Sequence, residues 1–191
     1  KHILLSGLDE SIVVNHRQFN LGIHCYGDIY EPRGHKYIVD FTAAPVPTLT
    51  YKIGETTLRK SVILAPDSDQ VMIKYEIVSS PASCELIHKL TRENPEARTG
   101  YRELENGVSF NMYEGFPDLN LQFSKASEFR YAPSWYKGIT YTDEYRRGFD
   151  CKEDLFVPGT FSLKLRKGES VIVSGSTAVE DAKGLSRKFT S

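Results

Sequence analysis

The chain has 191 residues, of which 40% are hydrophobic and 26% are charged, a composition typical of a globular protein and not of a disordered or fibrous one. Its formal net charge is −1 and its Lys and Arg residues are scattered, which argues against nucleic acids and anionic membranes as partners. No apolar run approaches the roughly 20 residues that a membrane-spanning helix needs.

The two ends of the chain suggest a larger protein. Residues Lys1–Leu5 already have the pattern of a strand and lack an initiator Met, and residues 178–191 change to a mixed helical or linker pattern. We therefore expect residues 1–177 to form one domain and residues 178–191 to lead toward a further domain. The cysteines Cys25, Cys84 and Cys151 are far apart and odd in number, which favours reduced thiols in a cytoplasmic protein.

Alternation of period two dominates the chain and is typical of half-buried strands. In chain order, it predicts strands around residues 49–53, 58–64, 71–77, 84–90, 108–112, 119–123 and 161–165. Turn residues fall between these runs, and we expect turns at Leu8–Glu10, Tyr26–Asp28, Ile53–Glu55, Pro66–Asp69 and Asn106–Gly107. Regular short strands with such turns predict an all-β, antiparallel β-sandwich with little helix.

Two segments depart from this pattern. Residues 91–106 form a long, charged connection with Pro95 and Gly100, and such connections are often functional or mobile. Residues 141–161 (YTDEYRRGFDCKEDLFVPGTF) are dense in charge and are expected to form a loop, too polar for a core strand and closed by a turn at Pro158–Gly159. Loops on rigid scaffolds carry function more often than the scaffold does.

The acids of the second segment have two interpretations. Glycoside hydrolysis uses two carboxylates, and the candidates here are Glu144, Asp150, Glu153 and Asp154. Arg146 and Arg147 lie among them, however, and Arg–carboxylate pairing holds carboxylates ionised and anchors loops. A salt-bridged loop that docks against another surface is therefore favoured over a catalytic dyad, and no catalytic residue is assigned.

Aromatic residues gather just before this segment. Trp135 and Tyr136 are adjacent, with Phe129, Tyr131 and Tyr141 nearby. Such rings either stack on sugar rings in a groove or pack in the core and in interfaces, and both alternatives stay open. The histidines show no metal-binding spacing and the glycines no phosphate-binding arrangement, so no metal or cofactor is expected.

Four short motifs follow one another in this part of the chain: Trp-Tyr, Glu-x-x-Arg-Gly-x-Asp, Glu-Asp-Leu and Pro-Gly, at residues 135–136, 144–150, 153–155 and 158–159. In this ordered set, the chain resembles the N-terminal domain of bacterial and archaeal glycogen debranching enzymes of the amylo-α-1,6-glucosidase type. Further similar segments are residues 1–10, 41–51, 74–78 and 117–119. An upstream Gly-rich segment of the family is missing, and an Arg-x-Tyr-His pattern is altered here to Arg98-Thr99-Gly100-Tyr101.

The resemblance implies a supersandwich, similar to that of galactose mutarotase, placed before an (α/α)6 barrel that contains the catalytic carboxylates. The implied function is a non-catalytic module that braces this barrel and shapes the cleft for an α-glucan such as glycogen. The parent enzyme would hydrolyse α-1,6-glucosidic branch linkages. Trp135, Tyr136, Glu144, Arg146, Arg147, Asp150, Glu153 and Asp154 are the candidate residues for substrate binding or domain contact.

Two alternatives come from other functional classes. The first is a free-standing carbohydrate-binding sandwich. The second is an aldose-epimerase-like enzyme, since mutarotases use a related sandwich. An epimerase requires a histidine facing a carboxylate in a concave sheet, and the only candidates are His24 or His88 with Glu144.

Overall fold

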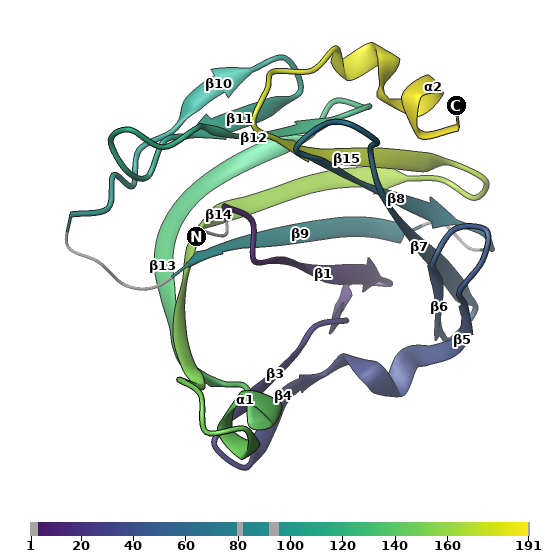
Figure 1. Ribbon diagram of the computed structural model, residues 1–191. Helices are drawn as coiled ribbons and strands as arrows, with labels where there is room; N and C mark the ends of the chain where they lie inside the picture. Colours follow the sequence, from purple (N-terminus) through teal and green to yellow (C-terminus); the bar gives the residue numbers. More distant parts are fainter. Residues whose placement is uncertain (1–3, 80–81, 92–95, 191) are drawn as a thin grey trace.

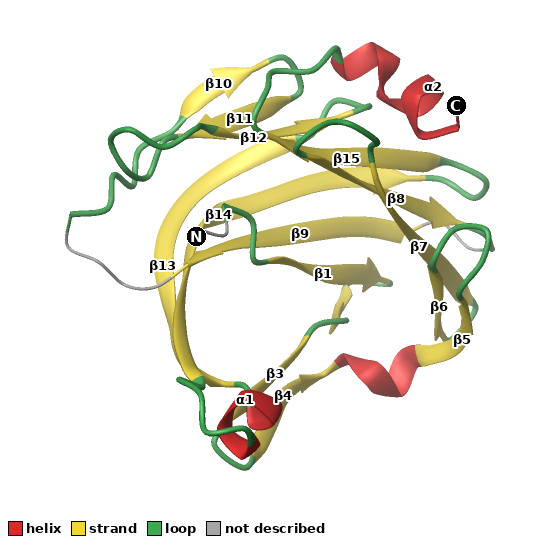
Figure 2. Ribbon diagram, viewed as in Figure 1, coloured by secondary structure: helices red, strands yellow, loops and turns green. Residues whose placement is uncertain are grey.

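The computed structural model describes residues 4–79, 82–91 and 96–190, with only the backbone described for residues 82–91. Two antiparallel sheets face each other, and a two-stranded hairpin lies beside the smaller one (Figure 1). Helix is confined to short segments in the described residues (Figure 2), namely η1 (Gly34–Tyr37), α1 (Thr142–Arg146), η2 (Ala182–Gly184) and α2 (Leu185–Thr190). The prediction of an all-β, antiparallel sandwich with little helix is confirmed.

The larger sheet has eight strands. Their order across the sheet is β10 (Arg102–Leu104), β11 (Gly107–Phe110), β12 (Leu119–Phe123), β15 (Ser170–Ser176), β8 (Gln70–Ile77), β7 (Thr56–Leu64), β6 (Thr48–Ile53) and β5 (Ile38–Thr42). The predicted turns at Gly54 and at Pro66–Asp69 connect β6 to β7 and β7 to β8. The predicted connection over residues 91–106 contains β10, and residues 92–95 lie outside the described part.

The smaller sheet has five strands in the order β13 (Glu128–Thr140), β14 (Lys152–Leu165), β9 (Ala82–Thr91), β1 (Gly7–Val14) and β2 (Arg17–Asn20). The expected turn at Leu8–Glu10 is wrong, because these residues belong to β1. Leu8 and Ile12 alternate onto the core, and Asp9 and Ser11 therefore point to the opposite, outer face of the sheet. The strand pattern at Lys1–Leu5 is not found at Leu4 and Leu5, which precede β1.

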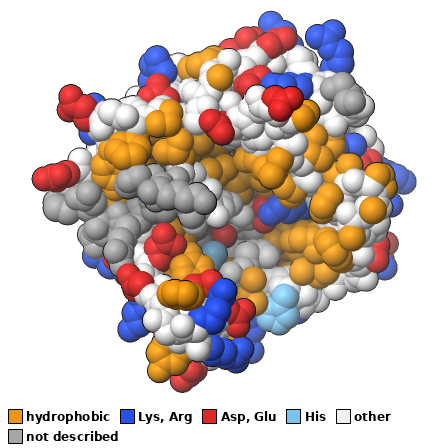
Figure 3. All heavy atoms as spheres, in the orientation of Figure 1, with side chains coloured by type: hydrophobic (Ala, Val, Ile, Leu, Met, Phe, Trp, Pro, Cys, Tyr) orange, Lys and Arg blue, Asp and Glu red, His pale blue; other side chains and the backbone are white. Residues whose placement is uncertain are grey.

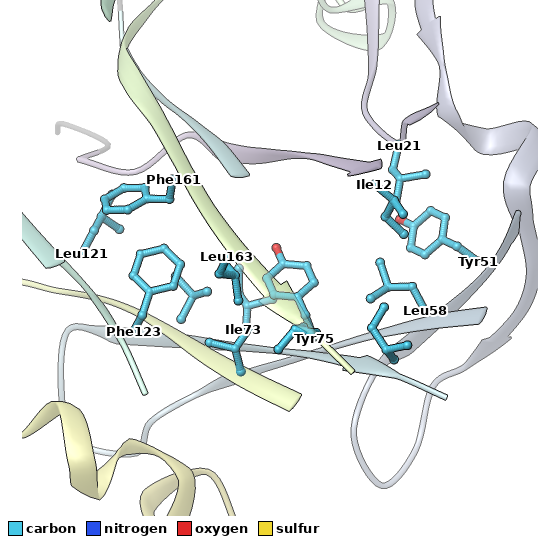
Figure 4. Close-up of a cluster of buried hydrophobic side chains, with 14 of the residues drawn as sticks. Ile12, Leu21, Tyr51, Leu58, Ile73, Tyr75, Leu121, Phe123, Phe161 and Leu163 are labelled. Atoms are coloured by element: carbon cyan, nitrogen blue, oxygen red, sulfur yellow. The ribbon is translucent and has the colours of Figure 1, made fainter. Parts of the chain in front are cut away.

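The hydrophobic core fills the space between the two sheets. Figure 4 shows side chains from both sheets meeting there, together with Leu21 from the segment between β2 and β3. The labelled residues are Ile12, Leu21, Tyr51, Leu58, Ile73, Tyr75, Leu121, Phe123, Phe161 and Leu163. The Phe161 ring of β14 lies 4.5 Å from the Phe123 ring of β12, centre to centre. Each fully buried side chain of this size contributes about 1.5–3 kcal/mol to folding, so this layer holds the sheets together.

A charged side chain of β1 is buried in this core. Glu10 on β1 is 4% exposed, and its carboxylate accepts a hydrogen bond of 2.5 Å from the Tyr75 hydroxyl of β8. The Lys60 ammonium of β7 pairs with the same carboxylate oxygen. These contacts tie β1 to the eight-stranded sheet, and they fix the strand whose outer face carries Asp9.

The segment expected to close on a turn continues as a strand. Pro158 and Gly159 lie inside β14, where the pairing with β9 and that with β13 both shift register. A Cβ atom at Gly159 would lie 2.2 Å from the carbonyl oxygen of Arg130, so β13 approaches this position too closely for a side chain. The expected turn was therefore wrong, and residues 155–159 are buried.

The C-terminal residues pack on the outer face of the larger sheet. Leu185 of α2 is fully buried against Ala65, Met72 and Ile172. Residues up to Thr190 thus add a small second cluster of hydrophobic side chains to the sandwich. That residues 178–191 also lead to another domain stays a prediction.

Candidate functional site

The charged segment leaves β13, turns through α1 and returns as β14. The Tyr141 amide donates to the Cys151 carbonyl oxygen at 2.8 Å, which closes the base of this excursion. Gly148 has a φ of +78° just after the helix, a conformation that favours glycine. The excursion is thus short, closed at its base and largely exposed.

The two arginines of this excursion pair within their own helical turn. Arg146 lies 3.2 Å from Asp143, and Arg147 lies 2.9 Å from Glu144. All four side chains are substantially exposed, so each pair contributes well under about 1 kcal/mol to the stability of this chain. The salt bridges described for these arginines therefore run to acids close in sequence and not to the acids of β14.

The two acids at the start of β14 have other contacts. Glu153 accepts a hydrogen bond of 2.6 Å from the Tyr141 hydroxyl, and Asp154 accepts one of 2.8 Å from the Gly138 amide. Burial, followed by the hydrogen bond and the charge of Glu153, raises the pKa of Tyr141 to about 12. Glu153 and Asp154 are consecutive in a strand and therefore point to opposite faces of the sheet. Asp150 lies in the exposed turn before them.

Trp135 and Tyr136 also point to opposite faces of the smaller sheet. The Trp135 ring packs on the core, with its centre 5.1 Å from that of Phe156. Tyr136 points outward, where its ring lies 6.3 Å from that of His24. Of the two predicted aromatic residues, Trp135 is thus a packing residue and Tyr136 lies in a pocket.

Most of the exposed large hydrophobic side chains belong to two segments of the described chain. Eight of the thirteen large hydrophobic residues exposed in the described chain lie on β3 (Ile23–Tyr26), β4 (Ile29–Arg33), β5 and the α1 excursion. We call this set the apolar rim, and its members are Ile23, Ile29, Tyr30, Ile38, Val39, Phe41, Tyr145 and Phe149. Figure 3 shows hydrophobic side chains among charged ones at the lower tip, where α1 and the β3–β4 hairpin lie.

A pocket of about 440 Å³ lies between the outer face of the smaller sheet and the β3–β4 hairpin. We call it the outer pocket, and the residues that define it are Asp9, Ser11, Asn20, His24, Tyr26 and Tyr136. The hairpin is held over the sheet by the Gly27 amide, which donates to the Thr140 hydroxyl of β13 at 3.3 Å. A pocket with a polar lining is thus formed by residues far apart in the sequence.

A histidine and a carboxylate face each other in this pocket. The Nε2 atom of His24 lies 2.8 Å from Oδ2 and 3.0 Å from Oδ1 of Asp9. A Cβ atom at Gly22 would lie 3.0 Å from the Asp9 carboxyl group. The absence of a side chain at Gly22 therefore allows the backbone to approach the Asp9 carboxyl group closely. Burial, followed by the charge of Asp9, raises the pKa of both Tyr26 and Tyr136.

The sequence did not predict this pair. His24 was considered with Glu144, but the structure places His24 on Asp9 and Glu144 on Arg147, so that pairing was wrong. His88 lies in the part of β9 whose side chains are not described. The missed signal was the polar pair Asp9 and Ser11, which alternates with Leu8, Glu10 and Ile12 on the opposite face of β1.

Cys25 and Cys151 are free thiols in the described part of the chain, where no cluster of three or more His, Cys, Asp or Glu side chains could hold a metal ion. Within the same residues, no helix is both long and apolar enough to cross a membrane.

Comparisons with known proteins agree with the fold. A family model described as "Glycogen debranching enzyme N terminal" matches residues 1–172. A search of curated proteins found no match. A bacterial glucoamylase complexed with acarbose superposes with a TM-score of 0.53 at 8% identity, over 98% of this chain and 31% of that chain. A polysaccharide lyase gives a TM-score of 0.40 at 13% identity, over 95% and 27% of the two chains, which is too loose to support an assignment.

At 8% identity, the likeness to the glucoamylase concerns the fold alone. The chain spans about 31% of the length of that enzyme.

Proposed function

Because this chain belongs to the family of glycogen debranching enzyme N-terminal domains, we propose that it is a non-catalytic β-sandwich that braces the catalytic domain of a larger enzyme. It also helps to shape the cleft for the α-glucan substrate. The catalytic domain of that larger enzyme is an (α/α)6 barrel that follows this β-sandwich, and it hydrolyses the α-1,6-glucosidic branch linkages. Trp135 stabilises the β-sandwich from within the core of the sandwich, and the other candidate residues act at the surface of the sandwich.

The observation that carries the bracing role is the apolar rim. Tyr145 and Phe149 are 72% and 65% exposed, and they stand among the charged side chains of the α1 excursion. An exposed cluster of large hydrophobic side chains with a polar surround is typical of a protein–protein contact, since its burial releases ordered water. Interfaces of this kind combine aromatic anchors with Arg, both of which the excursion provides.

The charged pairs of the excursion suit such a contact. In this chain, Arg146 and Arg147 pair with Asp143 and Glu144 in water, where the pairs are weak. Covered by a second domain, the same pairs would be desolvated, and their hydrogen-bonding geometry would then favour one docked orientation over others. Glu153 and Asp154 support the excursion from its base through Tyr141 and Gly138.

The alternative of an epimerase is not favoured by the geometry of the outer pocket. A mutarotase requires an acid and a base that act on two different oxygens of the sugar. Here the histidine and the carboxylate are bonded to each other, so they form one unit and not two separated groups.

The chain alone is expected to release no glucose from a branched limit dextrin. Glu153 and Asp154 point to opposite faces of β14 and cannot flank one glycosidic bond, as the two carboxylates of a glycosidase must. The test is a glucose assay after incubation of the purified chain with the dextrin. Release of glucose that disappears in the Glu153→Gln or Asp154→Asn variant would show that this domain itself contains the catalytic groups.

A further inference from the structure

The outer pocket has the size of a small-ligand site. Its volume of about 440 Å³ lies within the range of roughly 300–1,000 Å³ that such sites occupy in proteins. Its walls come from β1, β2, β13 and the β3–β4 hairpin, and the hydrogen bond from Gly27 to Thr140 fixes the hairpin to the sheet. The shape of the pocket is thus set by the fold and not by a single loop.

The lining combines aromatic rings with groups that bind hydroxyls. The rings of Tyr26 and Tyr136 flank the His24 ring at 6.4 Å and 6.3 Å between centres. At the exposed edge of the pocket, the oxygen of the Asn20 amide accepts hydrogen bonds from the Ser11 hydroxyl at 2.8 Å and from the Gln18 amide at 3.2 Å. These two hydrogen bonds orient the Asn20 amide beside the pocket.

The charges of the pocket favour a neutral ligand. The Asp9 carboxylate is held by His24, and the Glu10 carboxylate is turned into the core toward Lys60 and Tyr75. Among the described residues of the lining, Glu31, an exposed residue of the hairpin, is the one further carboxylate. A cationic ligand would need stronger uncompensated negative charge than this, whereas a sugar needs fixed donors and acceptors beside aromatic faces.

We propose that the outer pocket binds one uncharged hexopyranose unit of an α-glucan chain, with the Asp9–His24 pair and Asn20 contacting its hydroxyls and Tyr136 contacting a face of its ring. The choice of an α-glucan rests on the proposed function. The hairpin that covers the pocket also carries Ile23, Ile29 and Tyr30 of the apolar rim. A glucan held in the pocket therefore lies beside the surface that we assign to the catalytic domain.

The test is a titration of this chain with maltotriose, followed by isothermal calorimetry or by saturation-transfer NMR. Saturable binding in the millimolar range is expected for the wild type. The Tyr136→Leu and Asp9→Ala variants should each bind maltotriose with an affinity lower by a factor of about ten or more, because each variant removes part of the fixed lining. The Tyr131→Leu variant is the matched control, since this exposed tyrosine of the same strand lies outside the pocket and should leave affinity unchanged.

Three outcomes would overturn the inference. They are no saturable binding by the wild type, binding that both pocket variants retain, and displacement of maltotriose by a lysine-rich peptide but not by glucose. The last would assign the pocket to a cationic protein segment.

Far-UV circular dichroism of each variant shows whether it is folded, and Asp9→Asn, which keeps a hydrogen-bond acceptor for His24, replaces Asp9→Ala if the latter unfolds. Because all measurements use this chain alone, a failure here leaves the bracing role to be judged separately.

Discussion

Replacing Lys60 by methionine is expected to lower the free energy of unfolding by about 3–5 kcal/mol, because it leaves a buried carboxylate without its cation. Glu10 is 4% exposed, and Lys60 is the ammonium group that pairs with it. Burial and, second to it, the charge of Glu10 raise the pKa of Tyr51 to about 12. Denaturant unfolding of the wild type and of Lys60→Met measures the loss.

Two further variants isolate the cause. Lys74→Met removes a partly exposed lysine that lies 3.5 Å from Glu76, and it should cost less than about 1 kcal/mol. In a Glu10→Gln background, the glutamine oxygen still accepts the hydrogen bond from Tyr75 but carries no charge, so Lys60→Met should then cost much less than in the wild type. An equal loss in both backgrounds would mean that Lys60 acts through packing and not through its charge.

Replacing Gly34 by alanine is expected to destabilise the chain by about 3 kcal/mol, because the new methyl group would overlap the backbone. A Cβ atom there would lie 2.0 Å from the carbonyl oxygen of Leu21, and the Gly34 amide donates to the Gly22 carbonyl oxygen at 2.9 Å. Relief of the overlap requires movement of the segment that joins β2 to β3 and places His24. The variant should therefore also lose the affinity that we propose for maltotriose.

The control for this substitution is Gly100→Ala. A Cβ atom at Gly100 would meet no other atom within 4 Å, so the change should lie within about ±0.5 kcal/mol of the wild type. Thermal unfolding of the three proteins gives the comparison. A Gly34→Ala variant as stable as Gly100→Ala would show that the segment after β2 adapts easily and does not hold the pocket in place.

The strands that the sequence predicted are those with one face on the core. In β8, Ile73, Tyr75 and Ile77 are buried and alternate with Lys74 and Glu76, so a period of two is visible. β5 is exposed along its whole length, and β13 is an edge strand whose Pro133 coincides with a register shift. Neither strand has a hydrophobic alternation to recognise, because burial on one face is what creates that pattern.

The candidate site was predicted only in part for a similar reason. Tyr136 and the α1 excursion stood out by their composition, which depends on residues close in sequence. Asp9 and His24 come into contact only because the chain folds back over β1 through β2 and β3. Residues close to either one in sequence do not predict this contact. Asp9 was also predicted to lie in a turn, because it is a turn-forming residue. The alternation that identifies the strand becomes visible only when the residues on both sides of Leu8-Asp9-Glu10 are included.

The central claim is that the apolar rim docks against a catalytic domain, and its most direct test compares one variant in two proteins. Tyr145→Ser combined with Phe149→Ser should leave the thermal unfolding of this chain nearly unchanged, since both side chains already face water. In the full-length enzyme, the same variant should lower the unfolding temperature by roughly 4–8 °C, because truncated interface aromatics commonly cost about 2 kcal/mol or more. Leu64→Ser, at a residue that is 78% exposed outside the rim, should change neither protein. A loss of equal size in both proteins, or none in the full-length enzyme, would contradict the proposal.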